Sequence, residues 1–273
     1  MSTVDFEDPT LIPVKPEASS TPYRWKYGLC LLAASAVSSV LLIPFSYELM
    51  SQSKELGVSK ELLPAVLAIG VVIETFLAAV LIALGVGLGG RVGLGWPPIV
   101  GWGEGPEGRQ QAWRAVWLAA GLGVFLGVVV SVAGSLAEGT YTPKIADLKH
   151  PSWVSSLFGS LGAGVREEIW LRYGLLTFFA WLGTVALRSR TMTAPVFWTA
   201  NFLATLLFAA MHVPQAVALI GLSPAILAFI FLGNGVPGLF FGWLYWKRGL
   251  VSAMVCHFML DVVLKVVAPL VLD

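Results

Sequence analysis

The sequence has 273 residues, a net charge of +1, and a composition that is 57% hydrophobic but only 12% charged. Soluble globular domains carry about 25% charged residues, so this chain has too little charge to cover a water-facing surface. The near-zero net charge gives no reason to expect nucleic acid as a partner. The apolar runs are long and not alternating, which favours helices over a barrel. We therefore expect an all-α polytopic transmembrane helical bundle with the lipid bilayer as its partner.

The chain begins with a polar stretch, residues 1–24, which we predict to be a disordered N-terminal tail. Residues 1–22 contain four acidic residues and four prolines and have no apolar start. Arg24 and Lys26 then precede the first apolar run, and by the positive-inside rule they predict a cytoplasmic N-terminus.

Residues 25–150 are predicted to form the N-terminal membrane helices. Three apolar runs, 27–49, 62–88 and 112–137, each exceed the roughly 20 residues that cross a bilayer. Between the second and third, residues 89–111 are rich in Gly, Pro and Trp, which predicts a loop.

The second half contains four further apolar stretches, and the number of spans depends on the first of them. These stretches are residues 152–187, 192–212, 224–246 and 250–271. The chain has seven spans if residues 152–187 form one helix, and eight if that helix breaks near Gly162–Arg166. Seven spans place the basic residues after the fourth and sixth spans on the N-terminal side, as the positive-inside rule prefers. We nevertheless prefer about eight spans, because a helix starting at Glu167 would end at the same depth as His212; seven is the alternative.

Five acidic or histidine side chains lie in these apolar stretches, where a charge costs roughly 2.5–3.5 kcal/mol on insertion scales. Such residues usually face the bundle interior and mark a functional path. Glu74 also lies in a span, but it is alone there and we assign it no role. The five residues are Glu167, Glu168, His212, His257 and Asp261.

The spacing of these residues indicates which of them share a helix face and can interact. Glu168 and Arg172 are four residues apart and share a helix face, which predicts a structural ion pair. Glu167 points about 100° away from its neighbour and is left free for chemistry. His257 and Asp261 are also four apart, so the carboxylate can orient the imidazole.

Two chemistries remain open for this set. Two carboxylates and two histidines can bind and activate a water molecule, with or without zinc. A proton-coupled transporter would also use intramembrane Glu, His and Asp, although no internal repeat is evident. No G-x-S-x-G motif occurs, so nothing points to a serine hydrolase.

Three motifs in order resemble the CAAX-protease and bacteriocin-processing family of intramembrane endopeptidases, over about residues 150–270. One departure is Asp261, because many members of that family carry Asn at this position. The matches are Glu167-Glu168-Ile-Trp-Leu-Arg172 to EExxxR, Phe208-Ala-Ala-Met-His212 to FxxxH, and His257-Phe-Met-Leu-Asp261 to HxxxN/D.

The resemblance implies that residues 151–273 are a catalytic membrane domain whose site opens toward the cytoplasm. In this interpretation Glu167 is the general base, and His212 binds the attacking water. His257 steadies the oxyanion, Glu168 supports the site or acts as a second carboxylate, and Asp261 orients His257. Where a Zn²⁺ ion is bound, its ligands would be Glu167, His212 and His257.

The resemblance also implies a peptide substrate, either a prenylated CAAX peptide or a peptide in maturation. The architecture looks prokaryotic, so we expect the cell membrane of a prokaryote. A further alternative is a catalytically inactive family member that acts as a membrane interaction or immunity protein.

Overall fold

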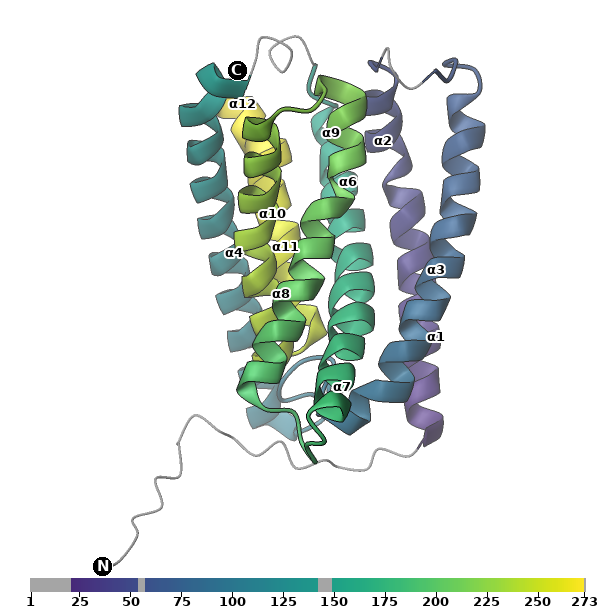
Figure 1. Ribbon diagram of the computed structural model, residues 1–273, viewed down its shortest axis with the longest axis vertical. Helices are drawn as coiled ribbons and strands as arrows, with labels where there is room; N and C mark the ends of the chain where they lie inside the picture. The colour runs from purple at the N-terminus through teal and green to yellow at the C-terminus, as the bar shows by residue number, and fades with distance from the viewer. Residues whose placement is uncertain (1–20, 54–56, 142–148, 273) are drawn as a thin grey trace, which may run out of the picture.

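A computed structural model describes residues 21–53, 57–141 and 149–272. The predicted tail, residues 1–24, lies almost entirely outside these ranges, and the first helix begins at Thr21. Within the described ranges, seven helical segments are long and apolar enough to cross a membrane. They stand side by side as one bundle (Figure 1). The expected all-α membrane bundle is therefore confirmed.

Most of the spans consist of more than one helix. The helices are α1 (Thr21–Leu41), α2 (Ile43–Met50), α3 (Leu63–Val92), α4 (Gly105–Tyr141), α6 (Trp153–Glu168), the π-helix η1 (Ile169–Leu176), α7 (Thr177–Ala186), α8 (Ala194–Met211), α9 (Val213–Ile220), α10 (Pro224–Arg248), α11 (Leu250–Val262), the π-helix η2 (Val263–Val267) and α12 (Ala268–Leu272).

The preference for eight spans is wrong for the described residues, because α6, η1 and α7 form one continuous span from Trp153 to Ala186. The glycines near the expected break serve close packing instead. A Cβ on Gly162 would lie 2.6 Å from the Ser38 carbonyl oxygen, and one on Gly164 would lie 3.0 Å from the Phe258 nitrogen. Small residues let membrane helices approach closely without ending them. The seven-span alternative matches the structure.

Seven alternating spans gather most of the basic side chains at one end of the bundle, the lower end in Figure 1, where α1 begins. We call this the basic end. By the positive-inside rule it is expected to face the cytoplasm. Its arginines and lysines include Arg24, Lys26, Arg91, Arg109, Arg114, Arg188, Arg190, Lys247 and Arg248.

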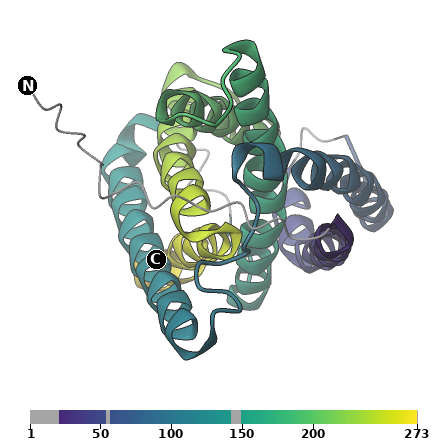
Figure 2. The same cartoon turned by 90° about the horizontal axis from the view of Figure 1, so that it is seen from below.

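The last long helix, α11, occupies an inner position, packed against α4, α6 and α10. Figure 2 shows α10 and α11 (yellow) between α4 on one side and the α6–α7 and α8 helices on the other. Because α11 carries His257 and α6 carries both glutamates, the packing of α11 on α6 brings the two halves of the candidate site together.

Candidate active site

Both glutamates lie at the C-terminal end of α6, immediately before the π-helix η1. Glu168 is fully buried and Glu167 is 7% exposed. Single π turns inside α-helices occur frequently at functional sites. Two adjacent buried carboxylates need partners, since an isolated buried charge is very costly.

The partners of Glu168 define its role. Its Oε1 accepts hydrogen bonds from Nη1 of Arg172 at 3.0 Å and from Nδ1 of His257 at 2.8 Å. An ionised carboxylate only accepts, so Nδ1 of His257 carries the hydrogen. This assignment leaves Nε2 of a neutral His257 with a lone pair for a second partner.

Arg172 is fully buried and joins three helices. Besides the predicted ion pair with Glu168, its Nη2 donates to the Gly238 carbonyl in α10 at 3.0 Å. Its guanidinium also lies 4.8 Å from the ring centre of Phe208 and 5.2 Å from that of Phe241. These contacts compensate the charge and tie the glutamate helix to α8 and α10.

The two oxygens of Glu167 differ. Oε1 accepts from Nη2 of Arg166 at 3.2 Å, whereas Oε2 is buried without a hydrogen-bond partner among the described residues. Oε2 lies 3.9 Å from Nε2 of His257. Two hydrogen bonds of about 2.8 Å that meet at about 90° span such a gap. The geometry therefore suits one water molecule bridging Glu167 and His257.

Asp261 does not orient His257 as expected. Its Oδ2 accepts from Nζ of Lys265 at 2.6 Å and lies 3.9 Å from Nε2 of His257. The orienting hydrogen bond comes from Glu168 on a neighbouring helix, because the ring turns Nδ1 across the helix interface. Asp261 instead lies near Nε2 of His257, the same ring nitrogen that faces Glu167.

His212 caps the C-terminal end of α8, and the chain continues directly into α9. Its Nδ1 lies 2.9 Å from the Phe208 carbonyl oxygen, which can only accept, so Nε2 of the neutral ring is left with a lone pair. The Phe208 ring packs edge-on against both His212 and His257, at 5.1 and 5.5 Å. His212 is also close enough to Glu167 for an electrostatic interaction.

Two residues of the site were missed by the sequence reasoning, Arg166 and Glu74. Nη1 of Arg166 pairs with Oε2 of Glu74 in α3 at 2.8 Å, while Nη2 holds Glu167. The guanidinium lies 5.2 Å from the Trp170 ring centre. The available signal was the cost of a lone Glu74 in an apolar span, which indicates a buried cationic partner.

The described residues do not fit a zinc ion. No three His, Cys, Asp or Glu side chains among them are arranged to hold a metal. Of the three expected ligands, Glu167 shares its Oε1 with the Arg166 guanidinium, and its Oε2 is 3.9 Å from His257. Tetrahedral zinc with bonds of about 2.0–2.2 Å needs a closer approach of its ligands. The described residues therefore support a reaction without a metal step.

The fold and the site together define a class: an integral membrane helical bundle with a buried cluster of carboxylates around a buried histidine. Residues 149–263 match the family model described as type II CAAX prenyl endopeptidase Rce1-like, so this part of the chain is similar to that family. The buried cluster of Glu167, Glu168 and His257 is consistent with the active site of the family. Comparisons with curated proteins and with solved structures each gave no significant match.

Proposed function

We propose that the protein is an intramembrane endopeptidase that hydrolyses a peptide bond with a water molecule activated by Glu167 and His257. The observation that carries this proposal is the buried, unpartnered Oε2 of Glu167, 3.9 Å from Nε2 of His257. Both atoms are acceptors when Glu167 is ionised and His257 is neutral, so one water can donate to both. The oxygen of that water then has its lone pairs free for attack.

In the proposed reaction the water oxygen attacks the carbonyl carbon of the scissile bond, and Glu167 accepts the proton that the water loses. The carbon–nitrogen bond then breaks, and the same proton moves to the leaving nitrogen. The products are a carboxyl group and an amine, and Glu167 returns to its carboxylate form. General acid–base catalysis of this kind contributes about 10²–10⁴-fold to a rate.

The other groups hold this pair in position. Glu168 fixes the tautomer of His257, and Arg172 fixes Glu168. His212 presents a second imidazole lone pair, which can accept from the water or from the amide of the substrate. The stacking of the His257 ring on Phe241, at 4.7 Å and 14°, restricts its rotation.

A proton-coupled transporter is less well supported by this geometry. A relay would spread its titratable groups along a path across the bilayer. Here Glu167, Glu168 and Asp261 all lie within 4 Å of one imidazole, that of His257. Convergence on a single ring is what hydrolysis requires, because all the groups must act on one water.

For the substrate we propose a peptide that reaches the site from the bilayer, with prenylated CAAX peptides as the first class to test. The experiment is a cleavage assay with purified protein and a panel of prenylated and unprenylated peptides. Glu167→Gln keeps the shape of the side chain and removes the base, so we expect a rate loss of at least about 10²-fold. The matched control is Glu61→Gln, an exposed glutamate, which should cleave like the wild type.

Three outcomes are informative. Equal cleavage by Glu167→Gln and wild type would overturn the proposed base. A folded wild type that cleaves no peptide of the panel would favour an inactive family member. Because the His, Cys, Asp and Glu side chains that the structure describes form no three-ligand set, a zinc chelator should leave the rate unchanged, and a loss that added Zn²⁺ restores would contradict the metal-free reaction.

A further inference from the structure

A pocket of about 310 Å³ lies at the basic end, between the first turns of α4 and the end of α10. Its lining combines two guanidinium groups with apolar side chains. We propose that this pocket binds the phosphate of an anionic phospholipid. The lining residues are Gln111, Arg114, Ala115, Leu118 and Arg248.

The two arginines of the lining make the pocket positively charged, which favours an anionic ligand. Neither Arg114 nor Arg248 forms a side-chain ion pair with any carboxylate that the structure describes. Nε of Arg248 is buried and has no hydrogen-bond partner among the described residues. Two like charges on one pocket repel each other, and a phosphate between them would remove that repulsion and take up the free N–H donors.

The position of Arg248 is fixed by the backbone. Its carbonyl accepts from the Val100 N–H at 3.0 Å, and the Val251 N–H donates to the Pro98 carbonyl at 3.0 Å. Between them Gly249 has φ +94, and a Cβ there would overlap the Pro98 carbonyl oxygen. The loop after α3 therefore holds the end of α10 in place, so the pocket exists before a ligand arrives.

The depth of the pocket points to a lipid rather than to a dissolved anion. Along α4 from Arg114, the next turn presents Trp117 and Leu118, which are 71% and 47% exposed. Such apolar side chains face the bilayer, so the pocket opens onto acyl chains on one side and onto the headgroup level on the other. Basic pockets between helices on the cytoplasmic side bind anionic headgroups.

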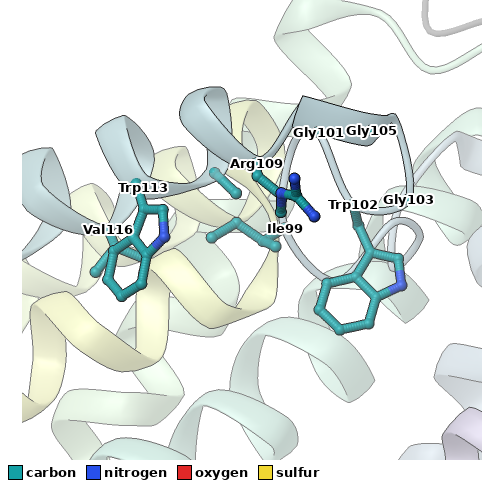
Figure 3. Close-up of a pocket in the computed structure, with 9 residues that line it drawn as sticks. Ile99, Gly101, Trp102, Gly103, Gly105, Arg109, Trp113 and Val116 are labelled. Atoms are coloured by element: carbon teal, nitrogen blue, oxygen red, sulfur yellow. The ribbon is translucent and has the colours of Figure 1, made fainter. Parts of the chain in front are cut away.

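A second pocket on another face of α4 supplies a matched control. It is larger, about 570 Å³, and holds a single arginine, Arg109, between the exposed rings of Trp102 and Trp113 (Figure 3). Arg109 and Arg114 lie on the same helix, about 7.5 Å apart along its axis. Arg109→Gln therefore removes the same charge from the same end of the protein, but leaves the Arg114–Arg248 pocket intact.

The test is native mass spectrometry of the detergent-purified full chain titrated with phosphatidylglycerol or phosphatidylcholine. The wild type should retain phosphatidylglycerol in preference. Since one basic residue near a membrane surface contributes about a five-fold gain in affinity for an anionic lipid, Arg114→Gln and Arg248→Gln should each weaken retention by about that factor. Arg109→Gln should stay close to wild type. Thermal unfolding without added lipid shows whether each variant is folded.

Two results would overturn the proposal. Equal weakening by all three variants would mean that the basic end attracts lipid without a specific pocket. Inorganic phosphate that displaces phosphatidylglycerol at equal concentration would mean that the pocket binds a dissolved anion. Arg114→Lys gives a further check: it keeps the charge but not the forked geometry, so intermediate retention supports direct phosphate contact. None of these variants touches the proposed catalytic groups.

Discussion

Glu168 on α6 and His257 on α11 are joined by a hydrogen bond of 2.8 Å between Oε1 and Nδ1. The bond crosses a helix interface, so the orientation of the imidazole depends on how α6 and α11 pack. The two adjacent glutamates therefore differ in their contacts with His257: Glu168 is hydrogen-bonded to Nδ1, and Glu167 faces Nε2. In the proposed reaction, the EExxxR motif thus contains a supporting carboxylate and a reacting one.

Replacing Glu168 should impair catalysis more than replacing Asp261. Removing the partner that orients an imidazole typically costs about 10–100-fold, so we expect Glu168→Gln to lower kcat by that factor, with little change in KM. Asp261→Asn should cost much less, because its close contact is Lys265. Steady-state kinetics on the monodisperse fraction of each variant test this. Equal losses of kcat in the two variants would indicate that Asp261 orients His257.

Replacing Arg172 should destabilise the fold. Arg172→Ala leaves the fully buried Glu168 without its cation and removes the hydrogen bond to Gly238. Breaking a buried ion pair costs about 3–5 kcal/mol, so we expect a loss of that size in the free energy of unfolding. Thermal or denaturant unfolding in detergent measures it, and the exposed Arg190→Ala is the control. A normal unfolding midpoint for Arg172→Ala would show that the pair is dispensable for folding.

Arg166 should act as a positioning residue for Glu167. Arg166→Gln removes the donor to Oε1 and frees both glutamates that it joins, so we expect kcat to fall while KM changes little. Arg166→Lys keeps the charge and should restore part of the rate. Glu74→Gln should have a smaller effect, since Glu74 is about one-third exposed and does not touch Glu167 directly. A loss in KM alone would instead indicate a role in substrate binding.

The seven-span topology predicts which side of the membrane each loop faces. In a variant without Cys30 and Cys256, a cysteine at Ser189 should react with an impermeant maleimide only after the cells are opened. A cysteine at Trp102 should behave in the same way, and one at Glu61 should react in intact cells. Labelling of Ser189→Cys in intact cells, with Trp102→Cys protected, would support the eight-span arrangement.

The membrane bundle was predictable because composition alone excludes a water-facing surface, and the basic residues already favoured seven spans. The expected break near Gly162–Arg166 is wrong because Gly162 and Gly164 serve close packing inside one continuous span. A glycine pair has the same sequence signature whether it ends a helix or lets a neighbour approach, and only the partner helix decides between the two. Here Ser38 and Phe258, distant in sequence, are those partners.

Glu167 and His212 lie at nearly equal distances along the chain from the turn between α7 and α8, so an antiparallel pair of helices brings them to a similar level in either topology. The unnecessary assumption was that a helix must begin at Glu167 and end at His212. In the structure both residues lie inside longer spans, because η1 continues the first and α9 continues the second.

The identities of the charged residues were predictable, but their pairing was not. An i, i+4 spacing suggested Glu168–Arg172 correctly, and it placed Asp261 beside His257, but the hydrogen bond of that ring is to Glu168 on another helix and the short contact of Asp261 is to Lys265. His257 has two carboxylates from α6 and one from its own helix within 4 Å. Periodicity gives neighbours on one helix and carries no information on contacts between helices.

The π-helix η1 has a consequence for how the fourth span is built. Before it, α6 packs against α1, α2 and α11; after it, α7 packs against α3 and α8. The wider π turn thus rotates one half of the span relative to the other. Deleting a single residue from η1 would rotate α6 by about 100° relative to α7. The carboxylates on α6 would then point away from His257, while α7 kept its neighbours. Chain length at this point, as much as residue identity, is a determinant of the site.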